Sequence, residues 1–236
     1  MVSQPPISID TDKGEASSKK AVIWDMDGVI VDTAQYHHKG WQIVFLKRGA
    51  NYTKEDFRRN TGKRSDSIIR SILGEKIAQG EIIAITREKD ENFRQLMGQN
   101  IRPFPGVLKL ITSLKEHGFK IAIASSAPME NIQLITRSLK IHNRFDAIIS
   151  GWEVTKGKPD PQTFLLAAEK LGVKAEDCIV IEDAIAGVTA SKRADMRCIA
   201  VTNTTSREEL READLIIDTL EEITIDDLER LLNQPK

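Results

Sequence analysis

Residues 22–29 read Val-Ile-Trp-Asp-Met-Asp-Gly-Val, an apolar run that ends in the pattern Asp-x-Asp-Gly. Apolar residues at successive positions are typical of a strand that is covered on both faces, as in a parallel sheet. Three later segments place polar groups at similar positions: residues 121–126 and 178–183 end apolar runs, and residues 156–161 form a Gly- and Pro-bounded loop. In an open α/β sheet, ligands bind outside the carboxyl ends of the strands. The four segments together therefore predict one site.

Strand-type and helix-type runs alternate along most of the chain. We expect strands at residues 20–25, 119–125, 147–150, 178–182, 198–201 and 215–217. We expect helices between and after them at residues 106–117, 129–139, 161–171, 184–194, 206–212 and 220–232. This alternation predicts an α/β fold with a doubly wound parallel-sheet, Rossmann-like core.

One long stretch breaks the alternation. Residues 33–100 contain no convincing buried strand, only helical patterns at 33–48, 54–60, 65–73 and 82–97. We expect this insertion to form an all-helical cap. The predicted domains are a flexible tail at residues 1–18, a catalytic core at 19–34 and 101–236, and the helical cap at 35–100.

Composition indicates an ordinary globular protein of 236 residues, with 40% hydrophobic and 29% charged residues. The net charge of −1 argues against a nucleic-acid-binding protein. No apolar stretch approaches the roughly 20 residues that span a membrane, and the first 18 residues lack the apolar core of a signal peptide. We therefore expect a cytoplasmic protein. We also expect a monomer, and we expect Cys178 and Cys198 to be buried reduced thiols.

Asp25 and Asp27 suit phosphoryl transfer from a phosphate monoester. Asp25 ends the first strand and can attack phosphorus, which would form an aspartyl-phosphate. Asp27 can protonate the leaving oxygen and later activate the incoming water or hydroxyl. The structural alternative is an Asp-Gly turn that closes a strand, with Asp25 capping a following helix.

Glu182 and Asp183 add two carboxylates at the end of another strand. Mg²⁺ prefers oxygen ligands, typically one or two carboxylates together with water and substrate phosphate. Asp25, the main-chain carbonyl of Asp27 and Asp183 could supply them, with Glu182 as a further ligand or as a residue that orients the ligands. The alternative is a capping role for the helix that begins near Ala184.

Ser125, Ser126 and Lys158 are candidate phosphate-binding residues. The Ser125 hydroxyl and the backbone N–H groups that follow can hold phosphate oxygens near the start of a helix. Lys158 can neutralise both the nucleophile and the transferred phosphate. The alternatives are a simple helix cap for the serines and a solvated loop lysine.

The chain resembles the haloacid dehalogenase-like phosphohydrolase superfamily, whose motifs match in order Asp25-x-Asp27-Gly28-Val29, Ser125, Lys158-Pro159 and Glu182-Asp183. The inserted helices are similar to the helical cap of that superfamily. The resemblance implies Mg²⁺ as cofactor, Asp25 as nucleophile, Asp27 as general acid and base, Ser125 and Lys158 on phosphate, and Asp25, Asp27 and Asp183 on the metal.

Within the superfamily, residues 32–41 are similar to the segment that enters the cap of the β-phosphoglucomutases. The resemblance implies substrate contacts for the cap residues His37, Trp41, Gly62, Arg64 and Lys89. His37 and Trp41 lie four residues apart and therefore share a helix face. The alternatives are a surface histidine, a core tryptophan and ordinary surface charges.

Two departures from the pattern of the β-phosphoglucomutases leave the reaction open between a phosphomutase and a phosphatase. The cap loop at 61–64 lacks one residue of the usual glycine-to-arginine spacing. Where the mutases carry a lysine-asparagine pair after the phosphate-binding serine, this chain has Ala127-Pro128-Met129-Glu130-Asn131. We expect Mg²⁺-dependent phosphoryl transfer from a small phosphorylated metabolite, a sugar phosphate, through an aspartyl-phosphate.

Three other functions fit the sequence less well. A haloacid dehalogenase would share the aspartate nucleophile, but halide displacement needs neither a second aspartate nor a divalent metal. A phosphorylated receiver module would lack the inserted helices. A non-catalytic binding scaffold is less consistent with four segments that all retain their reactive groups.

Overall fold

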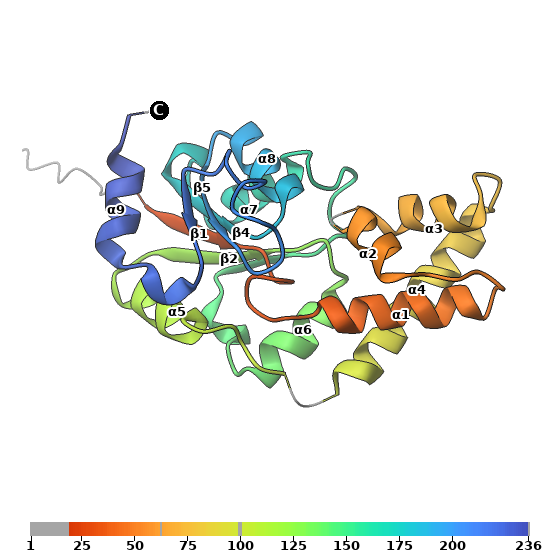
Figure 1. Ribbon diagram of the computed structural model, residues 1–236. Coiled ribbons are helices and arrows are strands. Elements are labelled where there is room, and N and C mark those ends of the chain that lie inside the picture. Colours follow the sequence, from red (N-terminus) through yellow and green to blue (C-terminus); the bar gives the residue numbers. More distant parts are fainter. Residues whose placement is uncertain (1–18, 62, 99–100, 236) are drawn as a thin grey trace, which may run out of the picture.

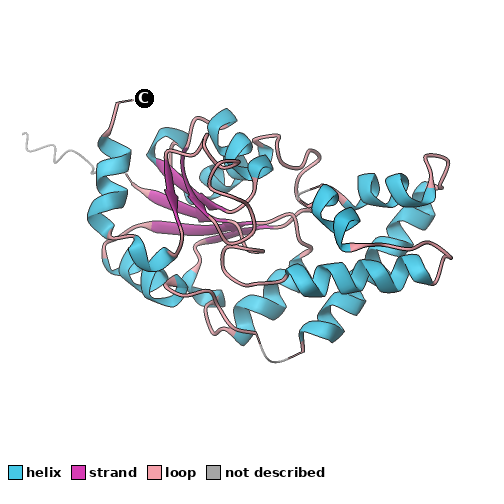
Figure 2. Cartoon of the chain, in the orientation of Figure 1, coloured by secondary structure: helices cyan, strands magenta, loops and turns pink. Residues whose placement is uncertain are grey.

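The computed structural model describes residues 19–61, 63–98 and 101–235. Its strands form a single six-stranded parallel sheet of order β3-β2-β1-β4-β5-β6 within the described part of the chain (Figure 2). The strands are β1 (Ala21–Trp24), β2 (Lys120–Ala124), β3 (Ala147–Ile149), β4 (Cys178–Glu182), β5 (Arg197–Val201) and β6 (Leu215–Ile217). The doubly wound α/β core with a helical cap is confirmed.

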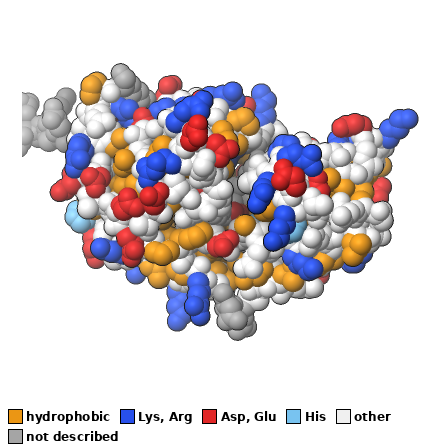
Figure 3. All heavy atoms as spheres, viewed as in Figure 1, with side chains coloured by type: hydrophobic (Ala, Val, Ile, Leu, Met, Phe, Trp, Pro, Cys, Tyr) orange, Lys and Arg blue, Asp and Glu red, His pale blue; other side chains and the backbone are white. Residues whose placement is uncertain are grey.

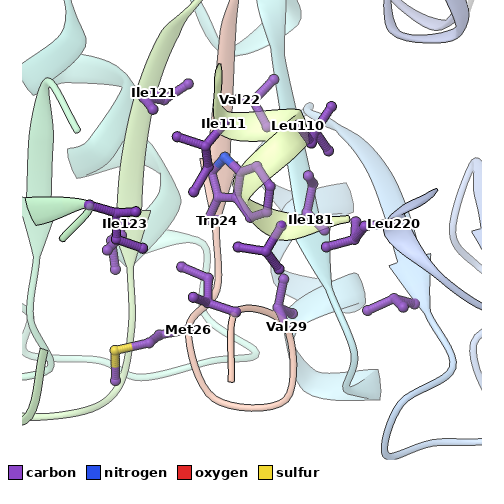
Figure 4. Close-up of a cluster of buried hydrophobic side chains, with 14 of the residues drawn as sticks. Val22, Trp24, Met26, Val29, Leu110, Ile111, Ile121, Ile123, Ile181 and Leu220 are labelled. Atoms are coloured by element: carbon purple, nitrogen blue, oxygen red, sulfur yellow. The ribbon is translucent and has the colours of Figure 1, made fainter. Parts of the chain in front are cut away.

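The central strand β1 is buried on both faces because its side chains alternate between two hydrophobic clusters. Val22 and Trp24 point into one cluster, and Ala21 and Ile23 point into the other. Figure 4 shows the Trp24 side chain packed among side chains of β2, β4 and the helix that carries Leu110 and Ile111. Apolar residues at consecutive positions are therefore what this strand requires.

Two layers of helices cover the sheet (Figure 1). The Trp24 face is covered by α5 (Val107–Glu116), α6 (Met129–Ser138) and α9 (Ile225–Asn233). The opposite face is covered by α7 (Gln162–Leu171) and α8 (Ile185–Arg193).

The inserted segment forms a separate helical module to one side of the sheet (Figure 1). Its helices are α1 (Ala34–Leu46), α2 (Lys54–Asn60), α3 (Ser65–Leu73) and α4 (Gln79–Met97). They surround a hydrophobic cluster of their own, which includes Trp41, Phe45 and Tyr52. The domain boundaries at 34/35 and 100/101 stay predictions, and the expected tail at 1–18 lies outside the described residues.

Two expected helices are wrong. Residues 206–212 form turns instead of a helix, because Ser206 and Glu209 bond each other locally and only Leu210 is buried. The expected helix at 220–232 is broken into a short 3-10 helix, Leu220–Glu222, and α9. Thr219 and Thr224 each begin a new capping box, and a capping box marks a helix start.

The mixed charge of the surface and the state of the two cysteines agree with what the composition led us to expect. Positive and negative side chains are interspersed over the face shown in Figure 3. Among the described helices, none has the length and apolar character to cross a bilayer. Cys178 and Cys198 are both buried and free of disulfides, and burial raises the pKa of each thiol to about 12.

Candidate active site

The candidate site lies where the sheet changes winding direction. β1 pairs with both β2 and β4, so the chain leaves β1 toward one edge of the sheet and later returns to the other side of it. Crevices at such switch points hold ligands in open α/β folds. Asp25 follows β1 directly, and Glu182 is the last residue of β4. The fold therefore brings together carboxylates that are more than 150 residues apart in sequence.

A cavity of about 630 Å³ opens at this edge of the sheet and extends to the cap. Its core wall includes all the core residues expected from the sequence, namely Asp25, Asp27, Ser125, Ser126, Lys158, Glu182 and Asp183. Its cap wall includes His37, Trp41, Arg64 and Lys89. Gly62, also expected at the site, lies outside the described residues.

The turn after β1 positions Asp25 and Asp27 by burying the residues around them. The Asp25 N–H donates to the Ile181 carbonyl at 3.0 Å, which continues the sheet by one residue. Met26 is fully buried in the core, and its carbonyl accepts from the Ile30 N–H at 2.9 Å. The two aspartates on either side of Met26 are left on the cavity wall.

Gly28 is required by a close approach between this turn and the end of β4. Its φ is +87°, and a Cβ atom there would lie 2.0 Å from Oδ2 of Asp183. Any other residue would be strained and would push against the Asp183 carboxylate. The glycine of the Asp-x-Asp-Gly pattern thus allows the two acidic loops to meet.

Lys158 is buried between two carboxylates. Its Nζ lies 2.5 Å from Asp25 Oδ1 and 2.6 Å from Glu182 Oε1. Burial alone would lower the pKa of Lys158, but the charges of Asp25 and Glu182 outweigh it and raise the pKa. The amine therefore stays positively charged at neutral pH.

Glu182 uses both of its oxygens within the protein. Oε1 accepts from Lys158, and Oε2 accepts from the backbone N–H groups of Asp183 and Ala184 at 2.8 and 2.9 Å. These contacts leave Glu182 placed to orient Lys158 and the loop after β4. Of the two roles considered for Glu182, the orienting one matches its contacts.

The carboxylates of Asp25 and Asp183 are held in an environment that disfavours their charge. Burial raises the pKa of Asp25 to about 7, although Lys158 opposes the shift. Burial, together with the charges of Glu182 and Asp25, also holds the pKa of Asp183 well above its usual range. When all are ionised, three buried carboxylates face one ammonium, which leaves two negative charges without a counterion.

Asp27 is linked to the cap by a chain of polar contacts. His37 Nε2 lies 3.2 Å from Asp27 Oδ1, and Lys89 Nζ lies 2.9 Å from His37 Nδ1. Burial alone would raise the pKa of Asp27, but the contact with His37 outweighs it and lowers the pKa. Burial and the charge of Lys89 lower the pKa of His37, despite the opposing effect of Asp27. Lys89 is also bonded to Asp90 at 3.0 Å.

The remaining expected residues have different surroundings. Ser125 is buried and its Oγ accepts from the Ala127 N–H at 3.0 Å, whereas Ser126 is exposed. Trp41 belongs to the cap's hydrophobic cluster and touches the cavity from there. Arg64 donates to the Thr155 carbonyl at 3.2 Å, so it bridges the cap to the loop that carries Lys158.

Three cavity residues did not stand out in the sequence. Asn203 Nδ2 donates to the Gly28 carbonyl at 2.8 Å, and the Thr204 hydroxyl bonds the Asp183 carboxylate. Together they connect the loop after β5 to both acidic loops. Thr163 is buried in the cavity wall, and its hydroxyl has no hydrogen-bond partner among the described residues. The strand-terminal position of residues 202–204 was the one available signal for Asn203 and Thr204.

Comparisons with known proteins agree with this geometry. Residues 22–201 match the family model described as haloacid dehalogenase-like hydrolase. The chain is 34% identical to β-phosphoglucomutase of Bacillus subtilis, over 88% of this chain and 92% of that protein. It is 31% identical to fructose-1-phosphate phosphatase YqaB of Escherichia coli, over 76% of this chain and 95% of that protein.

A longer plant protein and a solved structure extend the comparison. Protein SUPPRESSOR OF QUENCHING 1 of Arabidopsis thaliana is 34% identical over 95% of this chain, which spans only 22% of that protein. The crystal structure of β-phosphoglucomutase from Clostridium difficile has a TM-score of 0.83 at 28% identity, covering 91% of this chain and 97% of that one. The chain belongs to the haloacid dehalogenase-like hydrolase family, and within it is similar to phosphatases and phosphomutases of the β-phosphoglucomutase type.

Proposed function

We propose that the protein transfers a phosphoryl group from a sugar phosphate through an aspartyl-phosphate on Asp25, with Mg²⁺ as cofactor. The observation that carries the proposal is the pairing of Asp25 with Lys158 at 2.5 Å, beside Asp183 at the switch point of the sheet. A nucleophile, a cation for the transferred phosphate and carboxylates for a metal thus share one cavity. The names of the relatives support a small phosphorylated substrate.

The donor set fits Mg²⁺. Among the described residues, no group of three or more His, Cys, Asp and Glu side chains is arranged to hold a metal ion. Mg²⁺ does not need such a group, because one or two carboxylates, water and substrate phosphate suffice. Asp25 and Asp183 would be those carboxylates, with the Asp27 carbonyl as a third oxygen. When Asp25, Glu182 and Asp183 are all ionised, the two negative charges that Lys158 does not balance match a divalent cation.

The first step forms a bond between the Asp25 carboxylate and phosphorus and breaks the bond from phosphorus to the ester oxygen. Asp27 supplies the proton that the leaving oxygen takes. Arrival of a phosphate dianion raises the pKa of a nearby carboxyl, which allows Asp27 to hold that proton until it is needed. Bound Mg²⁺ would neutralise charge on the phosphate oxygens.

The second step releases the phosphoryl group from Asp25. Asp27 takes a proton from an incoming water, whose oxygen forms the new bond to phosphorus while the bond to Asp25 breaks. Lys158 and Ser125 hold the phosphate oxygens through both steps. We propose that the cap, residues 35–100, closes over the core and excludes bulk water during transfer.

The cavity walls favour hydrolysis over isomerisation. On the core side, Ala127 and Pro128 line the cavity and offer no cation for a second phosphate, while Glu130 is exposed and outside the lining. A mutase is the second candidate because four cations, Arg58, Lys63, Arg64 and Lys89, line the cap side.

An assay of the purified protein with MgCl₂ against a panel of sugar phosphates tests the proposal. We expect release of inorganic phosphate to exceed positional isomerisation of the sugar phosphate, with and without a sugar bisphosphate activator. Faster isomerisation than hydrolysis would identify the mutase instead. Absence of both reactions across the panel would refute the proposed substrate class.

Mg²⁺ should stabilise the protein more at about pH 8 than at about pH 5. The pKa of Asp25, raised to about 7, exceeds its unfolded value of 3.8. Between these two values the metal-free folded state holds a proton on Asp25 that the unfolded state has lost. The contribution of this carboxyl to stability therefore falls as pH rises from about 4 through about 7. Mg²⁺ replaces that proton, so its stabilising effect grows over the same range. Thermal unfolding with and without MgCl₂ at the two pH values measures the difference.

Two variants make the measurement specific to the site. Asp183→Asn should remove most of the Mg²⁺-induced rise in Tm, because one of the two carboxylate ligands is lost. Asp226→Asn, an exposed change on α9 at the far side of the core, should leave the rise unchanged. An equal rise at both pH values, or one that persists in Asp183→Asn, would count against this metal site.

A further inference from the structure

Trp152 is the most exposed aromatic side chain on the cavity wall. It lies in the loop between β3 and α7, lines the cavity, and keeps 62% of its surface accessible. Large aromatic side chains bury most of their surface in a typical fold. The described aromatic pairs do not include Trp152, so its ring has no stacking partner within that part of the chain.

The loop on either side of Trp152 is tightly held. The Gly151 N–H donates to the Ala127 carbonyl at 2.9 Å, and a Cβ at Gly151 would lie 2.2 Å from the Ser126 carbonyl oxygen. On the other side, Glu153 Oε1 accepts from the Ser150 N–H at 2.9 Å. The indole is therefore presented from a fixed backbone, next to the serine loop on which phosphate is proposed to bind.

The residues that line the cavity include three parts of different chemistry. Asp25 and Lys158 form a charged pair on the core wall, and the cations Arg58 and Lys63 line the cap wall. Trp152 supplies a flat apolar surface on the core side. A ligand that reaches all three regions needs a phosphate, a body with an apolar face and polar groups around that body.

We propose that Trp152 stacks on the sugar ring of the substrate and selects cyclic phosphate monoesters over acyclic ones. One face of a sugar ring carries C–H groups with partial positive charge, and the face of an indole is negative. A rigid aromatic surface costs little conformational entropy when it binds. This inference rests on the proposed function, because it assigns a contact to the sugar ring, the part of the proposed substrate that does not react.

A rival role for Trp152 is to pack against the cap when the cap closes. That role would affect every substrate to the same extent, because closure does not depend on the shape of the sugar. Ring stacking affects only substrates that have a ring. The comparison between cyclic and acyclic esters therefore separates the two.

The test compares Trp152→Ala and Trp152→Phe with the wild type on a hexose monophosphate and on glycerol phosphate. We expect Trp152→Ala to raise KM for the hexose ester about tenfold and KM for glycerol phosphate less than about twofold. Trp152→Phe should restore most of the affinity for the hexose ester. Leu165→Ala, which removes an exposed apolar side chain outside the cavity lining, is the matched control and should change neither KM.

Binding without turnover keeps this inference separate from the proposed reaction. In an Asp25→Asn background, the hexose monophosphate should quench tryptophan fluorescence, and the added Trp152→Phe change should remove most of the quenching. Trp24 and Trp41 are buried and remain in both proteins. An equal rise in KM for the two esters in Trp152→Ala, or unchanged quenching after Trp152→Phe, would overturn the role of Trp152. Adenosine monophosphate is compared in the same way. A larger rise in its KM than in the KM for the hexose ester would overturn the choice of a sugar ring.

Discussion

Asp25→Asn will lower kcat for phosphate release by at least about a thousandfold. The amide keeps the shape of the side chain but cannot form a bond to phosphorus through an anionic oxygen. Lys158 remains paired with Glu182 at 2.6 Å, so the cation that is proposed to hold the phosphate stays in place. Steady-state assays with the best sugar phosphate of the panel, at saturating MgCl₂, measure the loss.

The stability of Asp25→Asn provides the control for folding. In the metal-free protein the pKa of Asp25 is raised to about 7, so the folded state disfavours its charge at higher pH. Removing the charge should leave the Tm at about pH 8 unchanged or higher when no metal is present. Inactivity together with an undiminished Tm identifies a chemical role for Asp25. Normal Mg²⁺-dependent turnover of the variant would falsify the assignment of Asp25 as nucleophile.

The same buried charges give a physical reason for the proposed nucleophile and the proposed metal site to lie together. Three carboxylates and one ammonium are gathered at the end of β1 and β4, which is unfavourable in a protein interior without a further cation. A bound divalent ion would compensate the excess negative charge and would also neutralise charge on phosphate oxygens. On the proposed function, substrate binding would therefore depend on the metal.

Much of the fold could be predicted because strands buried on both faces leave a strong pattern. The apolar run that ends at Trp24 and the run Cys178–Glu182 contain hardly any polar residue, and both are strands. Helices of the cap were recognisable because short connections that each contain a glycine, such as residues 49–51, separate the helical patterns. The segment at 206–212 was mistaken for a helix because its charged residues suit a helix, whereas local bonds from Ser206 close turns instead.

The candidate site was predictable to the extent that its residues end strands or follow them closely. Asp25, Ser125 and Asp183 line one cavity because parallel strands end at the same edge of the sheet. The contacts of Thr204 with Asp183 were not predictable, because they depend on β5 lying beside β4. Short polar loops such as residues 202–206 carry no periodicity that would indicate which hydroxyl faces a carboxylate.

Asp27→Asn will lower kcat on a sugar phosphate by about a hundredfold to ten-thousandfold, because both the proton donor and the later base are lost. The loss should depend on the leaving group. p-Nitrophenolate leaves without a proton, so the variant should still form the aspartyl-phosphate from p-nitrophenyl phosphate and then stall. Stopped-flow measurements should show a burst of p-nitrophenol, about one per active site, followed by slow turnover.

The matched control is Asp32→Asn, at the far end of the same turn. Asp32 also lines the cavity, but it is exposed and its Oδ1 accepts from the backbone N–H of Ala34. Its loss should change kcat by less than about threefold and produce no burst. A phosphate mimic such as vanadate should bind both variants with near wild-type affinity, since Lys158 and Ser125 are unchanged. If Asp27→Asn lowered the rate equally on the alkyl and nitrophenyl esters and gave no burst, Asp27 would not take part in the proton transfers. Only a residue that moves the proton distinguishes leaving groups by their basicity.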